Sequence, residues 1–317
     1  MGPRGGRFMF YTASFGLLLQ IFSPVGANSI GVCYGLNGDN LPPPTEVINL
    51  YKNCGIQYLR IYEPNTAVLD ALRGSGILVA IGPKNSDLQG PRTSPGCSSR
   101  MDIPGEEAPF IASAMTNIKD ALTSIGLGHV LVTTVLSQKA LAASYPPSAG
   151  IFAPEIKTIM NDVATVLSST NTPLMINVYP YFAYANDPSE ISIDYVMFNS
   201  SEVVVQDRPY SYYTLFDAMV DAFNAALENI NHGDVGIAVA ETGWPTAGNP
   251  PFSSIEYAQT YNRGVYNHVF QYGTPRRPEV RMDTLFFAMF NEDLKPFGVE
   301  RNFGFFYPNM QPVYPFW

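Results

Sequence analysis

The clearest candidate for chemistry in this chain is a glutamate, Glu241, at the end of a short apolar run. The segment Val235–Thr246 reads VGIAVAETGWPT. Such a run is typical of a strand buried on both faces in a parallel sheet, and barrels of strands and helices carry their catalytic groups at the carboxyl ends of such strands. Trp244 provides a flat apolar surface beside Glu241 that suits a sugar ring, and Pro245 fixes the turn. The alternative is that Glu241 only caps the loop into the next helix.

A second group of charged residues follows the last apolar run. Glu292 comes directly after that run, with Lys295 and Glu300 close behind. A lysine between two acids can hold neighbouring carboxylates ionised; the alternative is a solvated loop network. Three polar or aromatic side chains also stand at the ends of apolar runs, where they would line a cleft: Tyr34, Asn177 and Tyr179. The alternative for these three is two core aromatics and a turn amide.

Other catalytic chemistries find little support. The three histidines, His129, His232 and His268, lack the spacing of metal ligands. The chain has no G-x-S-x-G elbow, no G-x-G-x-x-G and no phosphate loop. The sequence therefore predicts neither a metal nor a cofactor. What remains is carboxylates at strand ends among aromatic residues, a pattern typical of a glycosidase.

Short apolar segments alternate with amphipathic ones, which predicts a parallel sheet covered by helices. The predicted strands are 30–35, 58–62, 77–81, 130–136, 174–179, 235–240 and 284–290. The predicted helices are 45–54 (with Thr45 as N-cap), 66–73, 106–125, 154–167, 211–229 and 254–271. An eight-stranded barrel needs one more strand, and the gap falls at 82–105, a segment rich in Gly, Pro and Ser. We therefore expect a single α/β domain over 28–317, a (β/α)8 TIM barrel with strand four and its preceding helix missing or degraded.

The first 27 residues have the features of a secretory signal peptide. Arg4 and Arg7 precede the apolar stretch 8–22, and small residues end at Ala27, the predicted cleavage site. The apolar stretch is too short to span a membrane comfortably. We expect this segment to lie outside the fold and the chain to be secreted to the extracellular space or cell wall, in preference to a vacuole.

Charge narrows the possible partners. Without Arg4 and Arg7, 16 of the 18 basic residues remain against 27 acidic ones, a net charge of −11. A chain this acidic, with no basic cluster beyond Arg276 and Arg277, is a poor binder of nucleic acid or of an anionic membrane. We expect a neutral or cationic substrate and a monomeric protein.

Cysteines and one sequon add two smaller expectations. Three cysteines leave at least one unpaired. Cys33 and Cys54 have the positions of buried thiols, whereas Cys97 lies in the irregular segment and is the best candidate for exposure. Asn199, with Ser200 and Ser201, forms an N-glycosylation sequon that the secretory pathway could use.

Eight motifs in one order make the chain resemble plant endo-1,3-β-glucanases, glycoside hydrolase family 17. They are IGVCYGLNGDNLP (30–42), YLRIYEPN (58–65), SYPPSAGIF (144–152), LMINVYPYF (174–182), VVVQD (203–207), ETGWPT (241–246), TPRRP (274–278) and FAMFNEDLKPFGVERNFGFFYPN (287–309). The resemblance runs from Ile30 to the C-terminus except around 83–103. It implies a secreted hydrolase of the plant cell wall and plant defence that cleaves internal 1,3-β-glucosidic bonds of β-glucan with retention of configuration.

The resemblance also implies residue roles. The glutamate of the family's E-[ST]-G-W-P motif is the nucleophile, which places Glu241 in that role, and residues matching Glu292, Lys295 and Glu300 form a charged group beside it. The family's acid/base glutamate follows strand four in a G-N-E-V-[IV]-P-G-like segment. Its match here is 99–105, where Met101 occupies the glutamate position. A thioether cannot transfer a proton, so this position departs from the family.

Three acids lie near Met101 without matching the missing one: Asp102, Glu106 and Glu107. Asp102 is one residue out of register and on a strand would face the opposite side, while the two glutamates are typical of a helix's first turn. We expect no carboxylate from 99–107 within about 6 Å of Glu241. Three interpretations stay open: an active glucanase, a catalytically impaired glucan-binding homologue, or a gene-model or splicing artefact at 82–105.

Overall fold

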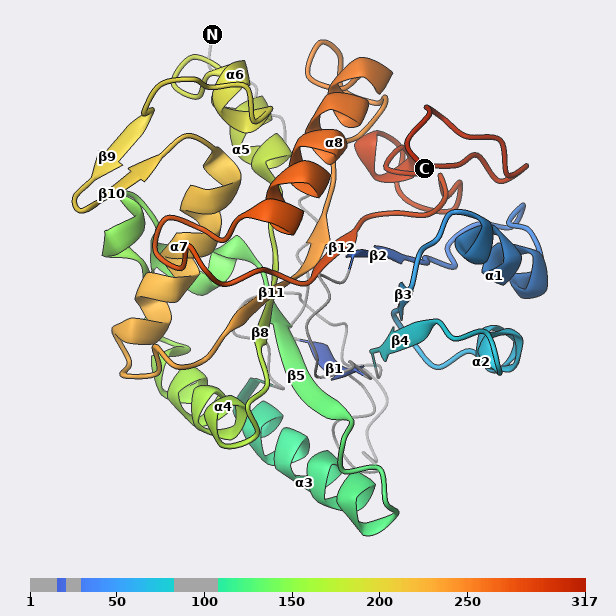
Figure 1. Ribbon diagram of the computed structural model, residues 1–317, viewed down its shortest axis with the longest axis horizontal. Helices are drawn as coiled ribbons and strands as arrows, with labels where there is room; N and C mark the ends of the chain where they lie inside the picture. The colour runs from blue at the N-terminus through green and yellow to red at the C-terminus, as the bar shows by residue number, and fades with distance from the viewer. Residues whose placement is uncertain (1–15, 21–29, 83–107) are drawn as a thin grey trace, which may run out of the picture.

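Eight strands close a barrel around which the helices are arranged (Figure 1). The computed structural model describes residues 16–20, 30–82 and 108–317. Around the barrel the order is β1-β4-β3-β2-β12-β11-β8-β5. Seven of these strands correspond to the predicted ones: β2 Ile30–Cys33, β3 Tyr58–Ile61, β4 Leu78–Ile81, β5 Leu131–Leu136, β8 Leu174–Asn177, β11 Ile237–Thr242 and β12 Thr284–Phe286. They pair in parallel with one another, and the predicted fold class is confirmed.

The six predicted helices are present, with shifted ends. They are α1 Pro44–Asn53, α2 Thr66–Leu72, α3 Ile111–Ser124, α4 Lys157–Ser169, α7 Leu215–Glu228 and α8 Ile255–Gln271. The prediction that Thr45 caps the first helix is wrong. Helix α1 begins one residue earlier, with Pro43 at the N-cap and no side-chain capping bond. Pro44 suits the first helical position because its missing N–H would have no partner there.

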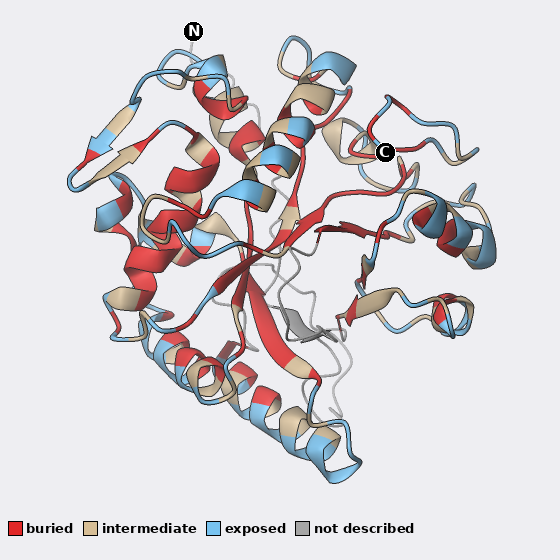
Figure 2. Cartoon of the chain, viewed as in Figure 1, coloured by how far each residue is buried: buried red, intermediate tan, exposed pale blue. Residues whose placement is uncertain are grey.

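Several short elements escaped the sequence analysis because they fall below the length at which periodicity is visible. They are the helices α5 Pro180–Asn186 and α6 Ile193–Val196, and the strand pairs β6 Leu141–Ala143 with β7 Ile151–Phe152 and β9 Val205–Asp207 with β10 Tyr210–Tyr212. Helix α7 contacts β6, β7 and β10, so it is buried on nearly all sides, as Figure 2 shows. Among the described residues, no helix has both the length and the apolar character that a membrane span requires.

The position between β4 and β5 is filled by β1, Gly16–Gln20, which runs antiparallel to both neighbours (Figure 1). The register pairs run from Gly16↔Val135 to Gln20↔Leu131 on β5, with Leu19↔Ile81 and Gln20↔Ala80 on β4. We expected residues 1–27 to lie outside the fold. The structure instead places Gly16–Gln20 of this segment in the barrel. The physical reason is that β4 and β5 would otherwise each present a row of unpaired backbone groups. Nearly all of the irregular segment 82–105 lies outside the described residues.

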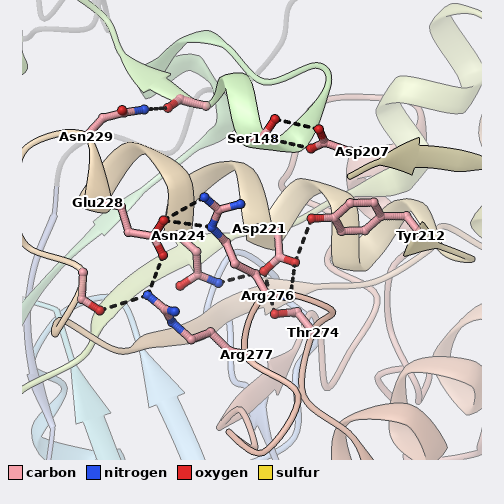
Figure 3. A network of polar contacts seen from close by, with 12 residues as sticks. Ser148, Asp207, Tyr212, Asp221, Asn224, Glu228, Asn229, Thr274, Arg276 and Arg277 are labelled. Carbon is pink, nitrogen blue, oxygen red and sulfur yellow. Dashed lines mark hydrogen bonds and ion pairs between the residues drawn. The ribbon is translucent and has the colours of Figure 1, made fainter. Parts of the chain in front are cut away.

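Arg276 and Arg277, the basic cluster noted in the sequence, are both paired with the same acid, Glu228 (Figure 3). Each guanidinium group lies 2.7 Å from a carboxylate oxygen of Glu228 near the end of α7. The backbone N–H of Arg276 also donates to the buried carboxylate of Asp221, at 2.9 Å. That carboxylate in turn accepts a hydrogen bond from the Tyr212 hydroxyl. These contacts fix the loop before β12 onto α7, so the two arginines have a structural role.

Candidate active site

Glu241 lies at the carboxyl end of its strand, as the sequence predicts. It is the next-to-last residue of β11 and pairs in register with Asn177, the last residue of β8. Its side chain is 12% exposed, enough for contact with a ligand while most of the carboxylate is enclosed. The chain segments around it are the ends of β3 and β8, so the residue points toward the barrel mouth and away from the helical shell.

Three donors hold the Glu241 carboxylate. One oxygen accepts from Arg60 Nη1 at 2.9 Å and from the Tyr62 hydroxyl at 3.0 Å. The other oxygen accepts from the Tyr179 hydroxyl at 3.0 Å. Both oxygens are therefore engaged, and the carboxylate has one fixed orientation. Preorganisation of this kind is what a nucleophile needs to meet its target in line.

Two of these donors, Arg60 and Tyr62, were missed by the sequence analysis. They belong to β3 and the residue after it, about 180 positions before Glu241 in the chain, as the separations of 181 and 179 show. One signal was available: Arg60 is the charged residue in an otherwise uncharged strand, YLRI. A charge in a buried strand must find a partner, so this arginine could have been sought beside an acid.

Burial sets the protonation of the surrounding groups. Burial opposes the charge on Arg60, but Tyr62 and Glu241 outweigh it and raise the pKa of the guanidinium above its usual range. Burial and the neighbouring Glu241 raise the pKa of Tyr179, so its hydroxyl keeps its proton and remains a donor. Burial also raises the pKa of the Cys33 thiol to about 12. Cys33 is thus an inert buried thiol, as predicted; Cys54 is free but only half-buried.

Glu292 and Lys295 form an ion pair below the same mouth. Lys295 Nζ lies 2.7 Å from one oxygen of Glu292, whose side chain is 1% exposed. The other oxygen accepts from the backbone N–H of Asn37 at 2.7 Å. Gly35 allows this arrangement, because a Cβ at that position would lie 2.3 Å from both carboxylate oxygens. A glycine is therefore required for the close approach.

Glu300 completes the charged group that the sequence predicts. It lies in the short 3-10 turn Val299–Arg301. Burial raises its pKa, and Glu241 and Glu292 add to that rise while Lys295 opposes it. The three acids and the lysine therefore act on one another electrostatically. The structure brings Glu241, at the end of β11, together with Glu292, Lys295 and Glu300, which all follow β12.

Trp244 requires a correction. We expected its ring to offer a surface to a sugar, but the residue is fully buried. Its indole N–H donates to the backbone oxygen of Phe252 at 3.0 Å, and its ring packs against Tyr181 at 5.0 Å and Tyr261 at 5.4 Å between centroids. Trp244 anchors the turn after β11 to the core. An aromatic residue beside a turn can point inward or outward, and sequence alone does not distinguish the two.

Tyr34 and Asn177 are also more buried than residues lining an open cleft would be. Tyr34 is 1% exposed and packs edge-on against Phe290; burial and nearby Glu292 raise its pKa to about 12. Asn177 is 4% exposed, and its side-chain oxygen has no hydrogen-bond partner among the described residues. A buried acceptor without a partner is unusual, so Asn177 keeps a polar atom available. The cleft that Tyr34, Asn177 and Tyr179 would line remains a prediction.

The acid/base position lies outside the described residues, together with Met101, Asp102, Glu106, Glu107 and Cys97. Their distances to Glu241 therefore remain predictions. In the described ranges, no group of three or more His, Cys, Asp or Glu side chains is arranged to hold a metal ion.

We expect Tyr179→Phe to lower kcat/KM about 10- to 100-fold, because a hydrogen bond to a charged group contributes roughly 1.5–3 kcal/mol. The substrate should be an aryl glycoside with a good leaving group, which needs no proton from an acid. Tyr184→Phe is the matched control, since the contacts of the Tyr184 ring are with Trp244 and Phe252. Equal rates for both variants would show that the Tyr179 hydrogen bond does not support catalysis.

Carboxylates at the carboxyl ends of barrel strands are typical of glycoside hydrolases, and Glu241 has this position here, held by Arg60, Tyr62 and Tyr179. The model of glycosyl hydrolases family 17 matches residues 30–95 and 98–316, and the chain belongs to that family. It is 42% identical over 313 residues to the probable glucan endo-1,3-beta-glucosidase BG4 of Arabidopsis thaliana, covering 91% of this chain and 90% of that protein. It is 41% identical over 312 residues to lichenase-2 of Hordeum vulgare, covering 92% and 99%.

Solved structures agree with the family. One, from work on two plant β-glucan endohydrolases with distinct substrate specificities, superposes with a TM-score of 0.83 at 41% identity, covering 90% of this chain and 99% of that one. CJP38, a β-1,3-glucanase and allergen of Cryptomeria japonica pollen, superposes with a TM-score of 0.83 at 38% identity, covering 90% and 98%. The resemblance noted in the sequence is confirmed.

Proposed function

We propose that this chain is an endo-1,3-β-glucosidase that acts with retention of configuration, with Glu241 as its nucleophile. The observation that carries the proposal is the carboxylate of Glu241 at the barrel mouth, oriented by Arg60, Tyr62 and Tyr179. Family membership and the printed names of the relatives support the substrate class. Glucan is neutral, which suits an acidic protein.

In the proposed reaction, a Glu241 oxygen attacks the anomeric carbon and forms a glycosyl ester as the bond to the leaving oxygen breaks. The leaving oxygen takes a proton from water. A second water molecule then attacks the anomeric carbon, gives its proton to the solvent and releases the Glu241 carboxylate. Arg60 offsets the negative charge of the free carboxylate. Lys295 compensates Glu292 and Glu300, and Asn177 offers its free oxygen to a sugar hydroxyl.

A second candidate is a catalytically impaired glucan-binding homologue, favoured by Met101 at the acid/base position. Retaining enzymes place a second carboxyl about 5–5.5 Å from the nucleophile to protonate the leaving oxygen. Without that acid we propose strongly reduced hydrolysis of a natural glucan, whose leaving group is a poor one. Binding would persist because it depends on the other residues of the cleft.

We also propose that the protein is secreted as a monomer after cleavage at Ala27, which removes β1 (Gly16–Gln20) from the barrel of the secreted form. The exposed position of Asn199 makes its sequon accessible to glycosylation. The mass of protein recovered from the medium of a plant expression host tests glycosylation, and its N-terminal sequence tests cleavage at Ala27. An intact N-terminus on the recovered protein would contradict cleavage.

The function is tested by incubating the purified protein with laminarin-type 1,3-β-glucan and with mixed-linkage β-glucan, because a lichenase is among the relatives. Reducing-sugar release measures hydrolysis, affinity electrophoresis measures binding, and NMR of the first products gives their anomeric configuration. We expect binding to 1,3-β-glucan, slow release of sugar and β-configured first products. A protein that neither binds 1,3-β-glucan nor releases sugar from it would contradict the proposed function. First products of α-configuration would contradict retention.

A further inference from the structure

Phe297 is the most exposed of the large hydrophobic side chains in the described part of the chain, at 93%. It lies in the loop after β12, two residues after Lys295 and three before Glu300. Single exposed apolar residues are common on protein surfaces. Exposure alone is therefore no evidence of function. Evidence that Phe297 binds a ligand must come from its surroundings.

The loop that carries Phe297 is held at several points. Arg301 Nε donates to the backbone oxygen of Lys295 at 2.7 Å, and Asn302 Nδ2 donates to that of Gly298 at 2.8 Å. The loop also packs closely on the turn after β11, because a Cβ on Gly248 would lie 2.5 Å from the carbonyl carbon of Gly298. The backbone that presents the ring to solvent is thus held in place, which lowers the cost of ordering the loop when a ligand binds.

Phe297 lies beside a charged residue, Arg301, that can donate hydrogen bonds to a ligand. The Arg301 guanidinium carbon lies 5.2 Å from the centre of the Phe297 ring, within the range of a cation–π contact. The guanidinium group has five N–H donors, more than its bond to Lys295 uses. An apolar ring suits the C–H face of a pyranose, and adjacent N–H donors suit its hydroxyl groups. Together the pair fits a neutral carbohydrate.

The loop is continuous with the active site. Lys295 Nζ reaches Glu292 at 2.7 Å and lies 4.0 Å from the centre of the Phe287 ring. Tyr62 packs edge-on against the same ring, at 6.4 Å, and donates to Glu241. Consecutive Cα atoms are about 3.8 Å apart, so the Cα atom of Phe297 lies within about 8 Å of that of Lys295.

We propose that Phe297 and Arg301 form an outer sugar-binding subsite, which holds a glucosyl unit of the β-glucan chain away from the bond that is cleaved. This rests on the proposed function, since the ligand is the substrate of Glu241. An endo-acting enzyme binds a polymer that extends beyond the reacting sugar. An outer subsite therefore strengthens the binding of long chains and leaves that of short ones unchanged.

The test measures binding in the Glu241→Gln background, so that turnover does not interfere. We expect Phe297→Ala to weaken the binding of soluble 1,3-β-glucan about three- to tenfold and to leave the binding of the disaccharide unchanged. Phe297→Trp should retain binding of the polymer. The matched control is Leu294→Ala, a residue of the same loop that is 63% exposed and should have no effect.

The outcomes separate this inference from the proposed function. If the Glu241→Gln parent binds the polymer and Phe297→Ala binds it equally well, the outer subsite is wrong and the proposed function stands. An equal loss in Leu294→Ala would also overturn the inference, because it would indicate a non-specific loop effect. A parent that binds no glucan would overturn both.

Discussion

Restoring a regular strand-four segment with a glutamate at the position of Met101 should raise the rate of 1,3-β-glucan hydrolysis about 10²- to 10⁴-fold, the usual contribution of general acid–base catalysis. The replacement covers residues 83–107 and uses the corresponding segment of a relative. It is made in a chain that begins at residue 28, so that β1 does not compete for the position between β4 and β5. Reducing-sugar release measures the rate.

A second chimera carries the same restored segment with methionine in place of the glutamate. It separates the effect of the strand on folding from the effect of the acid on chemistry. With an aryl glycoside that has a good leaving group, we expect the two chimeras to release the aryl group equally fast in the first turnover, because that step needs no proton. Later turnovers should be slower in the methionine chimera, because hydrolysis of the ester uses the glutamate as a base. Equal rates on the natural glucan would show that the chain uses another acid, and that the Met101 interpretation is wrong.

Removing residues 1–27 should lower the free energy of unfolding by at least about 3 kcal/mol. Strand β1 pairs with β5 at five positions and with β4 at two, and a backbone hydrogen bond contributes about 0.5–1.5 kcal/mol net. Each kcal/mol corresponds to roughly 2–4 °C of Tm in a protein of this class, so the loss should be visible. Thermal and denaturant unfolding of chains 1–317 and 28–317 measure it.

Two substitutions control for the loss of sequence itself. Leu18→Pro in the full-length chain should destabilise it in the same direction, because proline removes a backbone donor from the middle of β1. Leu18→Ala keeps that donor and should cost less. If both chains unfold alike and Leu18→Pro is neutral, β1 is not part of the barrel in solution, and residues 1–27 are a leader only.

Local features of the sequence predicted the main elements and the position of Glu241. Strands such as 174–179 and helices such as 254–271 are long and periodic enough for their burial pattern to be visible in the sequence. Glu241 could be placed because the end of a parallel strand is a local feature. The hairpin β9–β10, with two strands of three residues, carries no such pattern.

What the sequence did not predict depends on contacts between distant segments. Arg60 and Tyr62 reach Glu241 from the opposite half of the chain. The inward direction of Trp244 follows from its partners Tyr181 and Phe252. The place of β1 is decided by the unpaired strands beside it, a property of the assembled barrel. Each case is set by tertiary packing, which single-residue patterns do not encode.

The most direct test of the central claim, that Glu241 is a nucleophile, is covalent trapping. A 1,3-linked glucose oligosaccharide with fluorine at C2 of its reducing-end sugar and dinitrophenolate as leaving group forms the glycosyl ester without an acid and releases it slowly. We predict that mass spectrometry will find one added glycosyl group on the peptide containing Glu241, that Glu241→Gln will abolish it and that Glu292→Gln will keep it. Labelling of Glu292 or Glu300 instead, or no label on a protein that binds glucan, would contradict the account.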